Sequence, residues 1–483
     1  MTASLKQKTV NGFIWSFIDN FMNLGIQFVI GIILARLLSP REFGLIGMIL
    51  IFIAVSQTFV DSGFSQALIR KKNCTQKDYS TVFYFNLIIG VAIYFSLFFG
   101  SDSIGIFFKE PELSKILKVF TIVVVIESLT IIQRTILIKR VDFKLQAKIS
   151  ILATVFAGLI SIFMAKNGFG VWSLVALHLA KRSLNSLFLW FWNKWIPLWQ
   201  FSIKSFKELF SFGSKLLISA IIDTTYRNIY LLVIGKFFSA NELGFYTKAD
   251  EFKRLPSTNI YNIISRVSYP VLSSIQDDIP RLKIYYKKLI RSTMLITFTL
   301  MLGMAAVAKP MITVLIGEKW SPSVVYLQML SVVGMMYPLH ALNLNMLQVQ
   351  GRSDLFLKLE LIKKALAIPV ILIGVYFGIK AMIAGMIINT FISYYINSYW
   401  SGKLIGYSIR EQLKDLFPSF SIAFTVMIGI YFFGRVLPLN DLMQLIIQII
   451  SAVMLIFLFC EITKFKDYIF IKELLLEKIN KVN

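Results

Sequence analysis

Charged side chains that fall inside long apolar stretches are the residues of this sequence best suited to chemistry. The stretch at 209–235 contains Lys215, Asp223 and Arg227. Asp223 and Arg227 stand four residues apart, so on a helix they share one face and can form an ion pair. Because an ionisable group is costly inside a membrane, such groups usually face a partner or a polar cavity. The set therefore predicts either a neutral pair that fixes helix packing or, as we favour, a cavity wall that receives an anionic substrate.

The following stretch, at 244–274, is the least apolar of the candidate membrane spans. Its charged residues are Lys248, Asp250, Glu251, Lys253, Arg254 and Arg266. So many charges cannot all face lipid, which indicates a helix that lines a polar cavity. Pro256 is expected to bend or break this helix and to leave carbonyl groups that need other partners. We assign Lys248, Arg254 and Arg266 to the same substrate site as the preceding set.

Three carboxylates in the first part of the chain are candidates for binding a coupling ion, either H+ or Na+. Asp19 and Asp61 lie toward the expected cytosolic ends of the first two apolar stretches, and Glu127 lies near the middle of the fourth. Arg134 follows Glu127 by seven residues, on the same helical face. A structural, hydrogen-bonded carboxyl group is the alternative for Glu127. Asp61 could instead cap a helix break, because it is followed by Ser62 and Gly63.

The sequence offers no enzyme centre, metal site or bound cofactor. It shows no nucleophile triad, no glycine-rich phosphate loop and no supported pair of acid and base carboxylates, so we predict a protein that is not an enzyme. Two cysteines, Cys74 and Cys460, and two histidines, His178 and His340, form no cluster with metal-ligand spacing. We expect both histidines to be packed side chains.

Long apolar runs must position these groups. The 483 residues are 57% hydrophobic and 16% charged, whereas soluble domains average about 25% charged residues. Many runs approach the ~20 residues with which a helix crosses a bilayer. The fold class predicted is an all-α polytopic membrane protein with about fourteen transmembrane helices. The expected spans are 11–36, 43–68, 81–104, 114–138, 147–165, 170–192, 209–235, 244–274, 285–308, 321–349, 355–378, 381–402, 415–436 and 442–462.

The distribution of Lys and Arg predicts the orientation of these spans. The net charge is +24, with 50 basic residues, and most of them fall in alternate connecting segments. Because cytosolic loops of membrane proteins are enriched in Lys and Arg, both termini are expected in the cytosol. The positive charge is thus mainly a topology signal, and it also favours attraction to anionic lipid. We expect no nucleic-acid partner.

A helix-to-helix turn occurs twice, 200 residues apart. It reads ILARLLSPREFG at 33–44 and VIGKFFSANELG at 233–244. A Ser followed three residues later by Glu is a capping box for the second helix. Six spans precede the segment at 193–208, and six more follow it before a final pair of spans. This arrangement predicts two lobes related by an axis along the membrane normal. We expect an N-lobe at 1–205, a C-lobe at 206–405, and a C-terminal helix pair with a cytosolic tail at 406–483.

Several short stretches, in the same order along the chain, resemble polysaccharide-biosynthesis flippases of the multidrug/oligosaccharidyl-lipid/polysaccharide exporter superfamily. The closest similarity is to exporters of the O-antigen, colanic-acid and teichuronic-acid type. The stretches that carry the resemblance are LARLLSPREFGL at 34–45, DSGFSQALI at 61–69, GFGVWSL at 168–174, LGFYTKA at 243–249, YPVL at 269–272, GEKW at 317–320 and GR at 351–352.

The resemblance implies two six-helix lobes, often with two further helices, around a central cavity. It implies a flippase that moves undecaprenyl-pyrophosphate-linked oligosaccharide from the inner to the outer leaflet of the bacterial cytoplasmic membrane by alternating access. The expected partners are this lipid-linked oligosaccharide, membrane lipids, and possible polysaccharide polymerases and glycosyltransferases. Arginines in the cavity suit a pyrophosphate group, which they bind through forked hydrogen bonds.

Three alternatives stay open at this point. A cation-coupled drug or small-molecule exporter of the same superfamily would have a related shape, with a carboxylate cluster in one lobe. A membrane glycosyltransferase or polymerase would need larger outer loops than the short ones expected here. A peptidoglycan-precursor flippase would be expected to carry more arginines in its first lobe.

Overall fold

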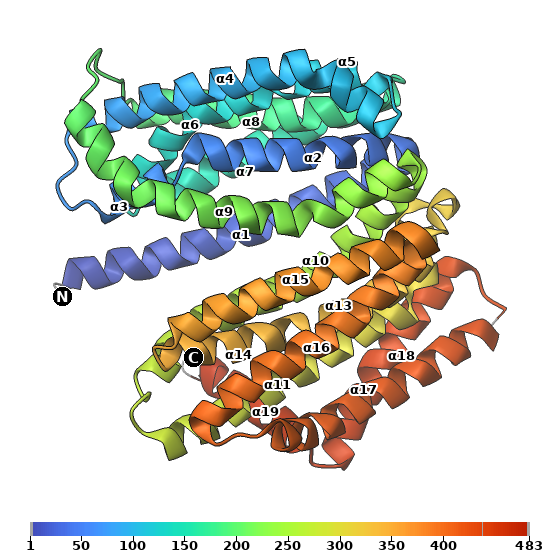
Figure 1. The fold of residues 1–483 in the computed structure, drawn as a ribbon. Helices are drawn as coiled ribbons and strands as arrows, with labels where there is room; N and C mark the ends of the chain where they lie inside the picture. Colours follow the sequence, from blue (N-terminus) through green and yellow to red (C-terminus); the bar gives the residue numbers. More distant parts are fainter. Residues whose placement is uncertain (1–2, 437, 481–483) are drawn as a thin grey trace. The chain divides into compact units, whose positions relative to one another are not determined.

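The computed structural model describes residues 3–436 and 438–480, with the side chains of residues 3–10, 13, 263, 266, 267 and 474–480 outside the description. All regular elements in this part of the chain are helices (Figure 1). They are α1 (Ala3–Leu37), α2 (Pro40–Asp61), α3 (Phe64–Arg70), α4 (Gln76–Phe108), α5 (Glu112–Phe120), α6 (Ile122–Lys139), α7 (Phe143–Lys166), α8 (Val171–Asn193), α9 (Ile203–Phe237), α10 (Ala240–Ser273), α11 (Ile279–Ala306), α12 (Ala308–Ile316), the 3-10 helix η1 (Glu318–Trp320), α13 (Ser323–Met335), α14 (Tyr337–Val349), α15 (Ser353–Phe377), α16 (Ile379–Ile405), α17 (Ile409–Val436), α18 (Asp441–Ile462) and α19 (Lys466–Asn480).

The all-α membrane fold is confirmed. Within the described residues, eleven helical segments are long and apolar enough to cross a membrane. The other three expected spans form the helices α8, α10 and α15, which are not among these eleven. Two expected spans are each divided by a single residue, at Thr121 between α5 and α6 and at Met336 between α13 and α14. These are the fourth and the tenth span, so the division repeats with the two halves of the chain.

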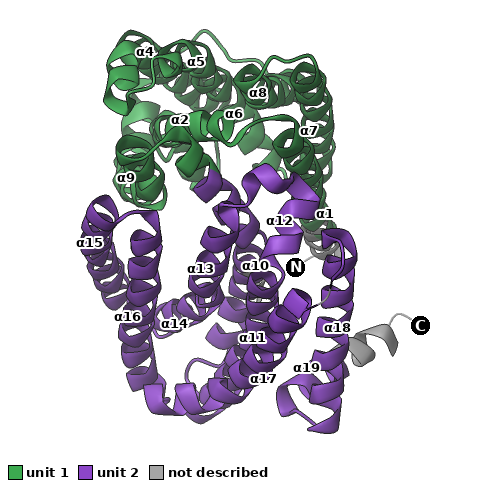
Figure 2. Ribbon diagram, turned by 90° about the vertical axis from the view of Figure 1, so that its right-hand side faces the viewer, with its two compact units in different colours: residues 1–244 green, residues 245–483 purple. Residues whose placement is uncertain are grey.

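The chain forms two compact units, residues 1–244 and residues 245–483 (Figure 2). In unit 1, α7 packs against both α1 and α8, and α4 packs against α6. In unit 2, α11 packs against α17 and α13, while α15 pairs with α16. The core of unit 2 contains Tyr286, Met294, Leu339 and Tyr407, all fully buried.

Helix α9, the first helix of the second sequence repeat, packs along α2 inside unit 1. The two helices approach closely at Gly213, where a Cβ atom would lie 2.7 Å from the carbonyl oxygen of Ser62. Midway along, the hydroxyl groups of Thr58 and Thr224 are 3.2 Å apart. Near the end of α9, the Lys236 ammonium donates to the carbonyl of Phe107. The boundary between the compact units therefore lies one helix later in the chain than the boundary between the sequence repeats.

The two copies of the repeated turn touch each other within unit 1. A Cβ atom at Gly44 would lie 1.8 Å from the carbonyl oxygen of Ala240, and one at Gly244 would lie 2.0 Å from that of Pro40. Only glycine allows two backbones to approach this closely. The predicted capping box of the first copy is present, because the Ser39 amide donates to the Glu42 carboxylate. Both glycines of the repeat thus serve one reciprocal contact.

Candidate functional site

Glu127 is the centre of a charged cluster inside unit 1. Its carboxylate accepts a hydrogen bond at 3.2 Å from Arg134, which lies two turns further along the same face of α6. It accepts a second hydrogen bond at 2.8 Å from Arg182 on α8. The carboxylate is 8% exposed, whereas the two arginine side chains are 34% and 35% exposed. Each guanidinium has five N–H donors and contacts Glu127 through one nitrogen. Both arginines therefore keep donors for an additional anion.

Asp19 on α1 lies next to this cluster. Its carboxylate accepts a hydrogen bond from the Asn23 amide at 2.6 Å, and that amide also donates to the Ser150 hydroxyl at 2.8 Å. Lys181 and Arg134 are close enough to interact electrostatically with Asp19. Asp19 is thus a half-buried carboxylate that links the α1–α7 contact to the basic groups of α6 and α8.

Asp61 is the last residue of α2, where the chain turns into α3. The break is formed by Ser62 and Gly63, which both adopt left-handed backbone conformations with φ of 47° and 71°. The predicted helix break at this position is therefore present. The Asp61 carboxylate accepts a short hydrogen bond from the Ser65 hydroxyl. Arg134 and Glu127 lie within electrostatic range of Asp61, so the break faces the same cluster.

These groups form one intramembrane cluster, which we call the unit 1 site. Its ionisable members are Asp19, Asp61, Glu127, Arg134, Lys181 and Arg182, three acids and three bases. They come from α1, α2, α6 and α8, so the site depends on the packing of four helices. With all six groups charged the site is neutral, and protonation of one aspartate leaves a net positive charge. The arrangement can bind an anion and respond to a proton or another cation.

The α9 set is arranged as its spacing predicts. The Arg227 guanidinium pairs with the Asp223 carboxylate at 2.8 Å. The Arg227 side chain is 67% exposed and the Asp223 side chain is 42% exposed. Lys215 is also exposed. Their exposure leaves them open to a ligand, to lipid headgroups or to other parts of the chain. Their role in substrate binding stays a prediction.

The charges of α10 pair largely with one another in unit 2. Asp250 accepts from both Lys253 and Arg254 at 2.6 Å, and Lys248 pairs with Glu251 at 2.8 Å. Asp250 and Lys248 are buried, which shows that this helix faces the protein and not lipid over its first turns. The side chain of Arg266, the remaining predicted site residue, lies outside the described residues.

Of the two effects expected at Pro256, a bend or a break, the break does not occur, because α10 continues through Pro256 and Pro270 to Ser273. Polar side chains beside the proline bond to backbone carbonyl groups. The Ser257 hydroxyl donates to the carbonyl of Lys253 at 2.9 Å, and the Asn259 amide donates to that of Leu255. Such side-chain donors are one way in which membrane helices tolerate proline.

Sequence reasoning missed Lys181 and Arg182 as site residues. They were counted among the basic residues of the cytosolic segments, but the structure places both in the middle of α8, beside Glu127 and Asp19. The available signal was their depth, since two adjacent cations at least ten residues from either end of a span cannot both reach the headgroups. The partner of Arg182 lies 55 residues away, and no local pattern indicates it.

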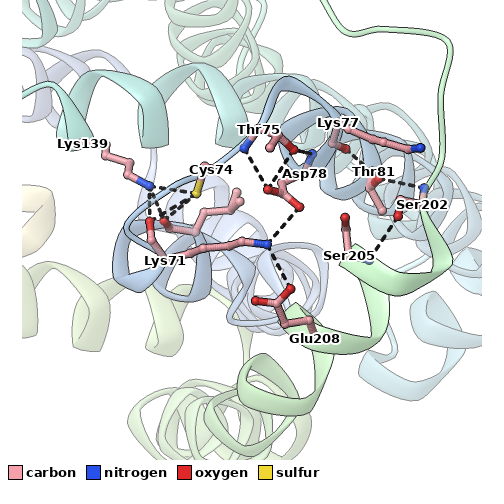
Figure 3. Close-up of polar contacts among 11 residues, drawn as sticks. Lys71, Cys74, Thr75, Lys77, Asp78, Thr81, Lys139, Ser202, Ser205 and Glu208 are labelled. Atoms are coloured by element: carbon pink, nitrogen blue, oxygen red, sulfur yellow. Dashed lines mark hydrogen bonds and ion pairs between the residues drawn. The ribbon is translucent and has the colours of Figure 1, made fainter.

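A second polar cluster holds the segment that joins the two sequence repeats (Figure 3). The Lys71 ammonium contacts the carboxylates of Asp78 at 3.2 Å and of Glu208 at 3.0 Å. Partial burial lowers the pKa of Lys71, but these hydrogen bonds outweigh it and raise the pKa above its ordinary value. The Ser202 amide donates to the Thr81 hydroxyl at 3.0 Å. The start of α9 is thereby fastened to α4.

Comparison with known proteins identifies the family. The family described as "Polysaccharide biosynthesis protein" matches residues 33–325, more than half of the chain. The chain belongs to the polysaccharide biosynthesis protein family. It is 28% identical over 450 residues to the lipopolysaccharide biosynthesis protein WzxC of Escherichia coli (strain K12), covering 90% of this chain and 89% of that protein. It is 27% identical to the teichuronic acid biosynthesis protein TuaB of Bacillus subtilis (strain 168), covering 73% of each.

Solved structures show the same fold. The lipid II flippase MurJ in an inward closed conformation matches with a TM-score of 0.76 at 16% identity, covering 95% of this chain and 100% of that one. An inward-facing multidrug resistance MATE transporter of the MOP superfamily matches with a TM-score of 0.63 at 16% identity, covering 82% and 98%. The family match confirms the resemblance to polysaccharide-biosynthesis proteins, and the two solved structures show that the fold is shared. With eleven described helical segments long and apolar enough to cross a membrane, this member of the polysaccharide biosynthesis protein family is a multi-pass membrane protein.

Proposed function

We propose that this protein flips a lipid-linked oligosaccharide across the membrane, from the inner to the outer leaflet, for the synthesis of a surface polysaccharide. The cargo is an oligosaccharide joined through pyrophosphate to a long isoprenoid chain such as undecaprenol. The relatives named for lipopolysaccharide and teichuronic acid biosynthesis support this cargo class. The two sequence repeats supply the two halves that alternating access requires.

The observation that carries this proposal is the pair of arginines held on Glu127. A buried carboxylate fixes the guanidinium groups of Arg134 and Arg182 while leaving each about one-third exposed. Arginine binds phosphate through two parallel hydrogen bonds, which suits the pyrophosphate bridge of the cargo. In this mechanism the unit 1 site holds the pyrophosphate, and the exposed cations Lys215 and Arg227 of α9 give further positive charge within unit 1.

Asp19 and Asp61 are the groups we assign to ion coupling. Each is a half-buried carboxylate within electrostatic range of Arg134. Proton binding to either aspartate would give the neutral site a positive charge and so favour the anionic cargo. Release of the proton would restore neutrality and favour departure of the cargo. Na+ could act in the same way by binding to a carboxylate.

The cellular setting follows from this cargo. We place the protein in a bacterial cytoplasmic membrane with both termini in the cytosol, as the distribution of Lys and Arg predicts. Glycosyltransferases that build the repeat unit on the cytosolic face would supply the cargo. A polysaccharide polymerase on the outer face would consume it.

Deletion of the gene tests the proposed function. We expect lipid-linked oligosaccharide to accumulate on the cytosolic face and the surface polysaccharide to disappear. Extracted lipid-linked intermediates and surface polysaccharide are measured in the same cells. Unchanged polysaccharide with increased drug sensitivity would overturn the proposal and support a drug exporter instead.

The Arg182→Gln variant tests the unit 1 site. Loss of a charged hydrogen bond to pyrophosphate costs about 1.5–3 kcal/mol, or roughly 10- to 150-fold in affinity. We therefore expect export in the deletion strain to fall by at least tenfold at an unchanged protein level. Arg410→Gln, at an exposed arginine near the start of α17, serves as the control. Equal export by the two variants would show that Arg182 does not contribute to cargo binding.

A further inference from the structure

An apolar groove runs between α1 and α7 in unit 1. Its cavity volume is about 440 Å³, and its wall includes Phe21, Gly25 and Val29 of α1 with Val155, Gly158 and Leu159 of α7. Phe21, Val29 and Leu159 are 65%, 55% and 59% exposed. A Cβ atom at Gly25 would have no atom within 4 Å, so this glycine leaves open space on the α1 side of the groove.

One end of the groove adjoins the unit 1 site. Val155 follows Thr154, whose hydroxyl donates to the Asn23 side-chain oxygen at 2.7 Å. Asn23 in turn donates to Asp19, and Asp19 lies in the field of Lys181 and Arg134. The apolar groove between α1 and α7 therefore ends close to the charged cluster that we assign to pyrophosphate.

The seam between α1 and α7 continues past the groove toward the amino-terminal ends of both segments. Lys144 of α7 lies there, with its ammonium 5.5 Å from the centre of the Trp15 ring on α1. Lys144 and Ile162, at the far end of the groove, are 18 residues apart on one helix, which corresponds to about 27 Å. This length approaches the ~30 Å apolar thickness of a bilayer.

We propose that this groove binds the isoprenoid chain of the lipid carrier while its pyrophosphate occupies the unit 1 site. The inference deepens the proposed function and rests on it. A groove between two helices takes one chain in single file, as an isoprenoid carrier has, whereas a phospholipid has two.

Charge complementarity supports the same occupant. Lys144 is exposed at the end of the seam that we place near the cytosol, where a phosphate group would approach. On the inner side, Lys181, Arg134 and Arg182 are balanced by Asp19, Asp61 and Glu127, so Lys144 leaves the seam and the site together with one positive charge in excess. A chain held along α1 and α7 would stay in contact with lipid while the head group enters the protein.

The test measures binding of a radiolabelled long-chain polyprenyl phosphate to the purified full-length protein in detergent. Gly25→Leu fills the open space from α1, and Leu159→Trp fills it from α7. Gly100→Leu is the matched control, because this glycine of α4 also has no atom within 4 Å of a built Cβ and lies outside the groove. Monodispersity on size-exclusion chromatography verifies that each variant is folded.

We expect Gly25→Leu and Leu159→Trp to bind the probe about tenfold more weakly, because displacing two methylene contacts at ~0.8 kcal/mol each corresponds to about 1.6 kcal/mol. Gly100→Leu should bind as the wild type does, and excess phosphatidylglycerol should not displace the probe. The groove assignment would be overturned if both groove variants bound the probe as tightly as the wild type does. It would also be overturned if phosphatidylglycerol displaced the probe as well as unlabelled polyprenyl phosphate does.

The same measurements separate this inference from the proposed function. If both groove variants bind the probe normally and the deletion strain still accumulates lipid-linked oligosaccharide, the groove assignment fails and the flippase function stands. If the wild type binds no polyprenyl phosphate and the deletion leaves the polysaccharide unchanged, the function fails as well.

Discussion

Glu127 shows how one buried acid can organise a basic site. Alone in the membrane, two nearby guanidinium groups would repel each other, and a carboxylate between them removes this repulsion while it fixes their geometry. The cost is that Glu127 is itself buried and depends on both partners. Its geometry with two arginines favours this organising role over that of a coupling carboxylate, which leaves Asp19 and Asp61 as the better candidates for ion coupling.

The Glu127→Gln variant tests this dependence. Removing one member of a buried ion pair typically destabilises a protein by about 3–5 kcal/mol. Because the arginines are one-third exposed, we expect a smaller loss, on the order of 2 kcal/mol, measured by thermal unfolding in detergent. Adding Arg134→Met to this variant should restore part of the stability by removing an unpaired charge. Additive losses in the double variant would contradict the pairing.

At the scale of elements, close glycine contacts decide how the helices meet. Gly63 and Gly213 bring the α2–α3 break against α9, and Gly44 and Gly244 bring the two repeated turns together. These contacts explain why unit 1 includes a helix that belongs to the second sequence repeat. The charged cluster around Lys71 fastens the same helix near its start.

Gly44→Leu should disturb the contact between the two turns. A side chain at this position meets the backbone of Ala240 at 1.8 Å, and backbone cannot yield as a flexible side chain can. Overpacking of this kind costs about 1–3 kcal/mol, so we expect a lower unfolding temperature and a clear loss of export. Gly100→Leu, which meets open space, is the control. Normal stability and export by Gly44→Leu would show that the turns are not held in contact in the functional protein.

Lys71→Met should loosen the attachment of α9. The Asp78 carboxylate is 3% exposed, and leaving a buried acceptor without its charged partner costs about 1–3 kcal/mol. The folded-state pKa of Lys71 is raised above its ordinary value of 10.5, so its contribution is complete below that pH and is lost as the pH rises further. The stability difference from the wild type should therefore be constant between about pH 7 and 9 and shrink above about pH 10.5. A difference that disappears by about pH 9 would contradict this assignment.

At the scale of the whole molecule, the orientation in the membrane follows from the basic residues. In a background with Cys74→Ser and Cys460→Ser, an impermeant maleimide should label Lys115→Cys in intact cells. It should label Lys77→Cys only after the membrane is permeabilised. Both lysines are exposed, so access depends on sidedness. The reverse pattern would invert the proposed topology, including the position of both termini.

The sequence by itself determined the all-α membrane fold, the repeat, the capping box at Ser39 and the helix break after Asp61. The repeat is visible because the stretches at 33–44 and 233–244 share residue types. The fold, the capping box and the helix break depend on residues within a few positions of one another or on the summed hydropathy of one helix, so local composition is sufficient. The ion pairs of α9 and α10 follow for the same reason, since their members stand three or four residues apart.

Only the tertiary structure decided which charges meet across helices. Arg182 reaches Glu127 over 55 residues, Lys71 reaches Glu208 over 137, and Gly44 meets Ala240 on the next copy of the turn. The groove between α1 and α7 likewise arises from two faces that are uniformly apolar in sequence. In a chain where nearly every helix face is apolar, hydropathy cannot select partners, and the choice falls to close packing at glycines and to the pairing of a few buried charges.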